Sequence, residues 1–231
     1  MQKYDCLNHP GGIEITKRAF DICSLPKSAK VLDIGCGHGD TAAYLTSGYG
    51  FSVTGLDKST ESITQAKQKH PDIEFIKGDG QWLDFDSLSF DCVLIECALS
   101  LMTLPVETIH EAYCVLKEGG YLIIHDLYIP HPSNEDLEII AKTGKSNEEQ
   151  IEGACREERK STCTVNGALV LNEIHNALSE LGFRPVLFED RKTDLDSYAA
   201  SLIFNGSDSK DLYQSKTKLS YFLMLVRKAN N

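Results

Sequence analysis

The sequence is most informative at Val31-Leu32-Asp33-Ile34-Gly35-Cys36-Gly37-His38-Gly39-Asp40, where an apolar strand runs into three glycines spaced by two. Glycine permits a sharp turn and lets a ligand approach bare backbone. A helix that begins directly after such a turn directs its free amide groups at the ligand. The spacing differs from the GxGxxG dinucleotide pattern, because the third glycine comes one residue early. These residues therefore predict a ligand site at the start of a helix.

Around this turn, short apolar strands alternate with helical patterns, which is typical of a doubly wound α/β fold with a mostly parallel sheet. The segment 60–69 has a helix cap at Ser59, and a second helix is predicted from 106 to 117, where Gly119-Gly120 would end it. We expect seven strands, at residues 31–34, 52–56, 73–76, 90–95, 121–125, 185–188 and 221–226.

The length of 231 residues favours a single domain that covers residues 1–231. A helical segment within residues 1–29 is expected to cover one end of the sheet. Residues 129–164 and 195–220 fit neither strand nor helix patterns, and we expect them to be two insertions that form a substrate cap.

Composition and charge narrow the classes of partner. A formal net charge of -11 and a pI near 5.1 disfavour nucleic acid and anionic membrane surfaces as partners. There is no long apolar run and no leader-like N-terminus, so we expect a soluble cytoplasmic protein, either a monomer or a homodimer. The eight cysteines are expected to be reduced, and because no CxxC pair exists, no metal site is predicted.

Two acidic residues follow the next two strands. Asp57 ends the second strand, where a carboxylate can accept hydrogen bonds from both hydroxyls of a ribose. Asp79, in Gly78-Asp79-Gly80, adds an acceptor suited to the exocyclic amine of adenine. Together with the glycine turn, these carboxylates indicate an adenosine-containing ligand at the carboxyl edge of the sheet.

At residues 30–128 the chain closely resembles the class I S-adenosylmethionine-dependent methyltransferases, in particular the small-molecule branch with the ubiquinone and menaquinone biosynthesis enzymes. The resemblance rests on "VLDIGCGHGD", "VTGLDKS", "FIKGDG", "FDCVLIE" and "VLKEGGYLIIHD", in family order. It extends loosely to residues 171–226. The resemblance implies a Rossmann-like three-layer α/β/α sandwich whose last strand is antiparallel, with S-adenosyl-L-methionine as cofactor and a small molecule as methyl acceptor.

The resemblance also implies roles for individual residues. Asp33 would lie near the methionine amino group, and Asp57 would hold the ribose. Lys58 would flank the adenine, and Asp79 with the Gly80 amide would bind its edge. The remaining cofactor positions would be Gly35, Gly37 and Gly39 around the methionine and ribose, and Glu96 and Cys97 on the reactive side.

Methyl transfer from a sulfonium is an in-line displacement, so a base is needed only when the acceptor carries a proton. His125 and Asp126, at the expected end of the fifth strand, are the candidate catalytic residues. His9 and His131 are candidate substrate residues near the same edge. For each histidine, a purely structural role is an equally good interpretation.

Two alternatives stay open. Cys155 and Cys163, with basic residues nearby, suggest a metalloid methyltransferase of the arsenite type, in which both thiols would bind the substrate. A non-catalytic S-adenosylmethionine-binding module would keep the cofactor residues and use its surface for partners.

Overall fold

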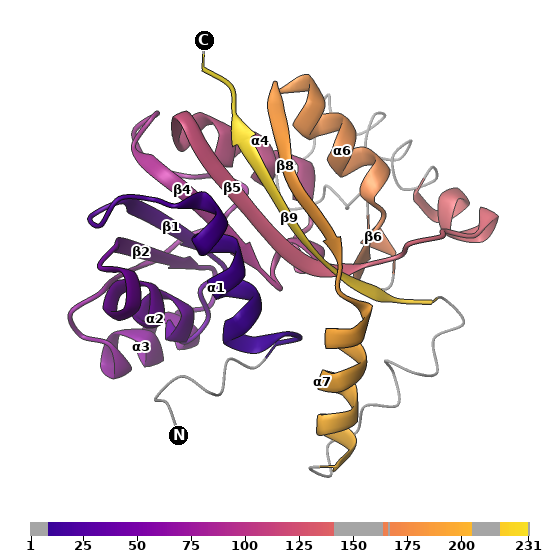
Figure 1. Cartoon of the computed structure of the whole chain (residues 1–231), viewed down its shortest axis with the longest axis horizontal. Coiled ribbons are helices and arrows are strands. Elements are labelled where there is room, and N and C mark those ends of the chain that lie inside the picture. The colour runs from indigo at the N-terminus through magenta and orange to yellow at the C-terminus, as the bar shows by residue number, and fades with distance from the viewer. Residues whose placement is uncertain (1–8, 141–163, 166, 205–217, 231) are drawn as a thin grey trace.

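The computed structural model describes residues 9–140, 164–165, 167–204 and 218–230. A mixed β-sheet forms its centre (Figure 1). Five neighbouring strands are parallel, in the order β3 (Glu74–Lys77), β2 (Ser52–Asp57), β1 (Lys30–Ile34), β4 (Phe90–Glu96) and β5 (Leu116–Tyr128). Beyond β5, β9 (Ser220–Lys228) pairs antiparallel with β5, and β8 (Phe183–Asp190) pairs antiparallel with β9. All seven expected strands are therefore present, and the last is antiparallel as expected.

Helices cover both faces of the sheet. One face packs against α1 (Gly12–Cys23), α2 (Asp40–Tyr49), α3 (Thr60–Lys69) and α7 (Lys192–Phe204). The other packs against α4 (Pro105–Val115) and α6 (Leu171–Glu180), and a short 3₁₀ helix, η1 (Leu99–Leu101), follows β4. Successive residues of a strand point to opposite faces of the sheet. Val31 packs in the core on the α1 face, and Leu32 packs in the core on the α4 face. The three-layer α/β/α sandwich predicted from the sequence is confirmed.

Two details of the β4–β5 region differ from the predictions. The helix expected to continue to residue 117 ends at Val115, because Leu116 is fully buried and pairs with Phe90 as a strand residue. Gly119, at φ 73°, lies inside β5 where the register with β4 shifts, so it makes a bulge and does not end the helix.

The fifth strand also extends further than predicted. It continues to Tyr128, which pairs with Ser220 of β9 and Leu169 of β7. His125 and Asp126 are therefore interior strand residues and do not lie at the strand end. A small hairpin of β6 (Thr164–Val165) and β7 (Ala168–Leu169) was not predicted, because each strand has two residues and gives no pattern.

The expected insertions are only partly described. Residues 134–140 are helical, and 141–163 lie outside the described residues. In the second segment, residues 195–204 belong to α7, whose buried Leu195 and Ala199 pack on the sheet; residues 205–217 lie outside the description. The helix was missed because its apolar residues do not gather on one face. At the N-terminus, α1 packs against the sheet through buried residues that include Ile15 and Phe20.

A search of the described helices for a membrane-spanning segment finds none that is both long and apolar enough.

Candidate cofactor and acceptor site

The glycine turn connects β1 to α2, and each of its three glycines has a positive φ, at 79°, 52° and 79°. A Cβ on Gly35 would lie 2.4 Å from the Cβ of Ala98, and one on Gly39 would lie 2.4 Å from the ring of Phe75. A Cβ on Gly37 would meet nothing within 4 Å. Packing therefore requires the outer two glycines, whereas the middle one leaves its backbone open to a ligand.

Asp57, the last residue of β2, holds this turn in place. Its Oδ2 accepts a hydrogen bond from the Gly37 amide at 2.9 Å, and its Oδ1 accepts one from the Ser59 amide at 2.8 Å. The parallel register of β1 and β2 brings the two chain segments together, since Ile34 pairs with Leu56. The carboxylate is thus fixed at the pocket mouth with lone pairs left for a ligand.

A pocket of about 240 Å³ opens between the ends of β1, β2 and β4. Asp79 lines it, accepting hydrogen bonds from the amide and the side chain of Gln81, while its other oxygen lies 3.1 Å from the Lys58 ammonium. Although burial opposes ionisation, these contacts with Gln81 and Lys58 lower the pKa of Asp79. The pocket is lined by Ile34, Gly35, Asp57, Lys58, Asp79, Gly80, Gln81, Cys97, Ala98, Leu101, Met102 and Thr103.

Asp33 lies deeper, on β1 beneath the glycine turn, and its side chain is 1% exposed. Its Oδ2 is buried without a hydrogen-bond partner among the described residues. Burial raises the pKa of this carboxyl well above its usual range, and the nearby carboxylates Glu96 and Asp57 raise it further. A buried carboxyl in this state favours a cationic ligand, which would supply both the missing donor and the missing charge.

Glu96, the last residue of β4, is surrounded by donors from four segments. Thr16 of α1 donates to Oε1 at 2.8 Å and Thr41 of α2 donates to Oε2 at 2.5 Å. His125 and His9 approach the same carboxylate, with Nε2 at 2.7 Å from Oε1 and 3.4 Å from Oε2 respectively. Although burial opposes ionisation, contacts with His125, His9 and Thr41 lower the pKa of Glu96 to about 2. Protein groups thus hold Glu96 as an anion.

The side chain of His125 is fully buried, and it reaches Glu96 because the two residues pair across β4 and β5. Its Nδ1 lies 2.8 Å from the Tyr221 hydroxyl, which in turn lies 2.8 Å from the Cys97 sulfur. Cys97 itself has φ 50°, an unusual value for a residue with a side chain, and its amide donates to the His125 carbonyl. These contacts join β4, β5 and β9 into one polar network.

Asp126 has a different environment. Its carboxylate accepts hydrogen bonds from the amide and hydroxyl of Ser100 and from the amide of Leu127. Burial raises its pKa, and the Ser100 donors oppose that rise. This geometry makes Asp126 the anchor of η1, the segment that forms one wall of the pocket.

The structure thus brings most of the sequence-predicted residues to one edge of the sheet. His9 lies against His125, with ring centroids 5.2 Å apart. His131 is exposed, and Cys155 and Cys163 lie outside the described residues. Thr16, Thr41 and Tyr221 were not predicted, since a hydroxyl in a helix or a strand carries no spacing signal.

The order of the parallel strands and the antiparallel β9 define the Rossmann-like methyltransferase fold. A family model described as "Methyltransferase domain" matches residues 25–198, and the chain belongs to that family.

Curated relatives share the central part of the chain. It is 38% identical over 112 residues to phthiotriol/phenolphthiotriol dimycocerosates methyltransferase 1 of Mycobacterium ulcerans, covering 47% of this chain and 40% of that protein. It is 33% identical over 135 residues to demethylmenaquinone methyltransferase of Chlorobaculum tepidum, covering 55% and 56%. The matched region thus spans about two fifths to just over half of the length of these relatives.

Solved structures of similar fold cover almost the whole chain. A putative sarcosine dimethylglycine methyltransferase from Galdieria sulphuraria superposes with a TM-score of 0.71 at 17% identity, covering 94% of this chain and 84% of that one. Phosphoethanolamine N-methyltransferase 2 of Haemonchus contortus, solved in complex with S-adenosyl-L-methionine, gives 0.71 at 18% identity, covering 97% and 55%. At these identities the likeness concerns the fold.

Proposed function

We propose that this protein is an S-adenosyl-L-methionine-dependent methyltransferase that acts on a small molecule. The observation that carries the proposal is the buried, unpartnered Oδ2 of Asp33 beneath a glycine turn whose middle residue is open to a ligand. A cofactor with a cationic amino acid end and an adenosine end matches this arrangement, because Asp57 and Asp79 line the adjoining pocket.

The residues of the pocket divide the binding of this cofactor. Asp33 would accept from the amino group, the Gly37 backbone would lie against the methionine and ribose, and Asp57 would accept from the ribose hydroxyls. Asp79 and the Gly80 amide would bind the adenine edge, with Lys58 beside it. Cys97 lines the same pocket. Glu96 is not among the residues that line it and instead contacts its histidine and threonine partners.

When bound, S-adenosyl-L-methionine supplies an electrophilic methyl group for in-line transfer. The protein would hold the acceptor about 3 to 3.5 Å from that methyl group. Leu101 and Met102 form an apolar rim on this pocket, and the Leu101 side chain is 78% exposed. An apolar acceptor fits this rim, in line with the demethylmenaquinone and phthiotriol named for the relatives.

His125 is the better candidate for a proton acceptor, and Asp126 the weaker one. The Glu96 carboxylate lies beside Nε2 of His125, and Nδ1 faces the Tyr221 hydroxyl. A proton lost by the acceptor would therefore reach Nδ1 through Tyr221, whose hydroxyl gives its own proton to Nδ1 and takes up the acceptor's. Asp126 uses both oxygens to bind Ser100 and Leu127.

Further parts of the proposal concern partners and location. We propose a monomer or homodimer that binds no nucleic acid, in line with the net charge of -11. A cytoplasmic location is supported by five free cysteines in the described part of the chain, at positions 23, 36, 92, 97 and 114.

Calorimetry with S-adenosyl-L-methionine tests the proposal. We expect saturable binding by the wild type and a loss of roughly 100-fold in affinity for Asp57→Ala, because two charged hydrogen bonds disappear, worth about 3 kcal/mol together. Asp72→Ala, at an exposed carboxylate after α3, is the matched control. An absence of binding, or equal affinity in both variants, would refute the cofactor assignment.

A second experiment separates enzyme from binding module. The protein is incubated with S-adenosyl-L-methionine and a panel that includes demethylmenaquinone, a phthiotriol, simple phenols, amines and arsenite, and S-adenosylhomocysteine is measured. Formation of this product with an organic acceptor supports the proposal. Binding without product from any acceptor supports the module instead, and product from arsenite alone supports the metalloid alternative.

A further inference from the structure

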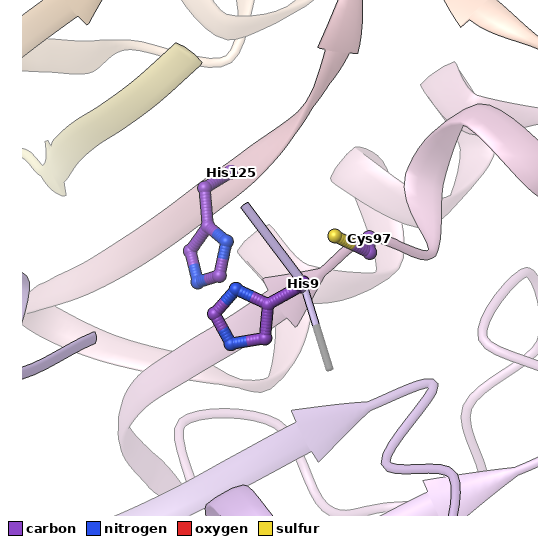
Figure 2. Close-up of side chains that lie close together, drawn as sticks. All are labelled: His9, Cys97 and His125. Carbon is purple, nitrogen blue, oxygen red and sulfur yellow. The ribbon is translucent and has the colours of Figure 1, made fainter. Parts of the chain in front are cut away.

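Two histidines and a cysteine from distant parts of the chain meet beside the pocket that the cysteine, Cys97, also lines. His9 precedes α1, Cys97 follows β4, and His125 lies on β5. One nitrogen of each imidazole and the thiol sulfur all lie within 4.8 Å of one another. Figure 2 shows the two rings and the thiol turned toward a common space. We propose that His9, Cys97 and His125, here called the histidine–cysteine cluster, bind a transition-metal ion of the zinc type.

The surroundings favour ion binding over a simple packing role. The Nε2 atoms of both histidines are buried and lack a hydrogen bond among the described residues, although both lie near Glu96. Their approach to the carboxylate is close but not aligned as a hydrogen bond. A small rotation of each ring toward a shared ion would align Nε2 with Glu96, giving the carboxylate–histidine–metal arrangement common at metal sites.

The two nitrogens of each ring have different neighbours. The Nε2 atoms lie near Glu96, so we assign the Nδ1 atoms to the ion, which would replace their present hydrogen bonds with the Tyr221 hydroxyl and the Pro10 carbonyl. Nδ1 of His125 faces the network that contains Cys97, through the Tyr221 hydroxyl. Nδ1 of His9 lies 3.1 Å from the carbonyl of Pro10, a contact with its own neighbour that ring rotation would break.

The donor set determines the kind of ion. Two imidazoles and one thiolate suit Zn²⁺ and Co²⁺, whereas Mg²⁺ and Ca²⁺ prefer oxygen ligands. The Tyr221 hydroxyl, 2.8 Å from two of the donor atoms, offers a fourth ligand. Burial raises the pKa of the Cys97 thiol, so in the metal-free protein this thiol keeps its proton. Metal binding would therefore release that proton to solvent.

Cobalt titration tests the site without reference to methyl transfer. The full chain is treated with a chelator, dialysed and titrated with Co²⁺, whose thiolate complexes absorb in the near ultraviolet. We expect one equivalent to bind with this charge-transfer band, and Zn²⁺ to displace it. Cys97→Ser should abolish the band, and His9→Gln should weaken binding by more than tenfold.

Two matched controls and a variant at Glu96, which contacts both histidines, complete the test. Cys114→Ser and His110→Gln change an exposed thiol and an exposed imidazole on α4 and should leave the titration unchanged. Glu96→Gln, which acts through the histidines, should weaken Co²⁺ binding roughly 10- to 100-fold while keeping the band. No His125 variant is used, because a substitution at this fully buried position can unfold the protein. Circular dichroism checks that the other variants are folded.

The proposal is overturned if no thiolate band appears, or if the band survives Cys97→Ser at full strength and so comes from another cysteine. Calorimetry with S-adenosyl-L-methionine on the same preparation keeps the two proposals apart. Cofactor binding without the band refutes only the metal site, and the band without cofactor binding refutes only the proposed function.

Discussion

The glycine turn and the histidine–cysteine cluster lie at the same edge of the sheet, yet they are built in opposite ways. The turn is made of backbone: its shape depends on positive φ angles, and Asp57 fastens it through the Gly37 amide. The cluster is made of three side chains near Glu96, which come from the residue after β4, from β5 and from the segment before α1. The shape of the turn thus depends on local backbone and one carboxylate of the neighbouring strand, whereas the cluster depends on the assembled fold.

The largest effect on stability should come from Glu96→Gln, which removes the negative charge beside His9 and His125. The folded-state pKa of Glu96 is lowered to about 2, so its contribution is present above the ordinary pKa of a glutamate and is lost as the pH falls toward 2. We expect the variant to lower the free energy of unfolding by about 3 kcal/mol at neutral pH.

Urea unfolding near pH 7 and about pH 3 measures this dependence. The difference between wild type and variant should shrink by more than half at the lower pH. Glu135→Gln, at an exposed glutamate, is the control and should show little change at either pH. A difference that stays constant with pH would mean that packing, and not charge, explains the loss.

In the glycine turn, two alanine substitutions should separate an effect on packing from an effect on ligand access. Gly39→Ala places a Cβ against Phe75 at a positive φ, and should lower the free energy of unfolding by about 2 kcal/mol or more. Gly37→Ala meets open space, so only the positive φ costs stability, about 1 kcal/mol, yet the methyl group would obstruct the cofactor. Thermal unfolding and calorimetry of both variants provide the comparison. Equal cofactor affinity in wild type and Gly37→Ala would contradict the prediction that the cofactor lies against Gly37.

Asp33→Asn should change stability and binding in opposite directions. The raised pKa of Asp33 means that its charged form burdens the ligand-free fold more as the pH increases. Replacing it should therefore stabilise the ligand-free protein at neutral pH and weaken binding of S-adenosyl-L-methionine. Melting curves with and without cofactor measure both effects, with Asp72→Asn as control. A variant that is less stable and still binds normally would show that Asp33 has no part in the site.

A small effect on stability should also come from Tyr221→Phe, which keeps the ring and removes the hydroxyl between His125 and Cys97. We expect a loss of about 1 kcal/mol in the free energy of unfolding, the usual contribution of a buried hydroxyl. Tyr113→Phe, at a half-buried tyrosine on α4, is the control. If Tyr221→Phe matches Tyr113→Phe in stability, the Tyr221 hydroxyl contributes nothing specific to the network.

The contrast explains what could be predicted from the sequence. The strands and the positions of Asp33, Asp57 and Asp79 follow from local patterns, because parallel strands all present their carboxyl ends at one edge. The glycine spacing likewise concerns neighbouring residues. Assignment of these residues to a cofactor stays a prediction; in the structure Gly35, Asp57 and Asp79 line one pocket, and Asp33 is buried on β1 beneath the glycine turn.

The other half depends on pairings that no local pattern contains. Tyr221 reaches His125 because β9 pairs antiparallel with β5 and places Tyr221 opposite Leu127, on the face that His125 shares. Thr16 and Glu96 are likewise eighty positions apart in the chain. The extent of β5 was underestimated for the same reason: its last residues are strand only because β7 and β9 pair with them.

The position of β9 has a consequence for the order of assembly. Among the described strands it is the last in the chain, yet it lies between β5 and β8 and carries Tyr221, which contacts His125 and Cys97 of the cluster. During synthesis, β5 therefore waits with one edge unpaired until the residues of β9 have left the ribosome. The parallel strands can form first, and Tyr221 reaches His125 and Cys97 only when β9 inserts. A nascent chain that stops before residue 218 would contain the glycine turn but would lack Tyr221, the residue that contacts His125 and Cys97.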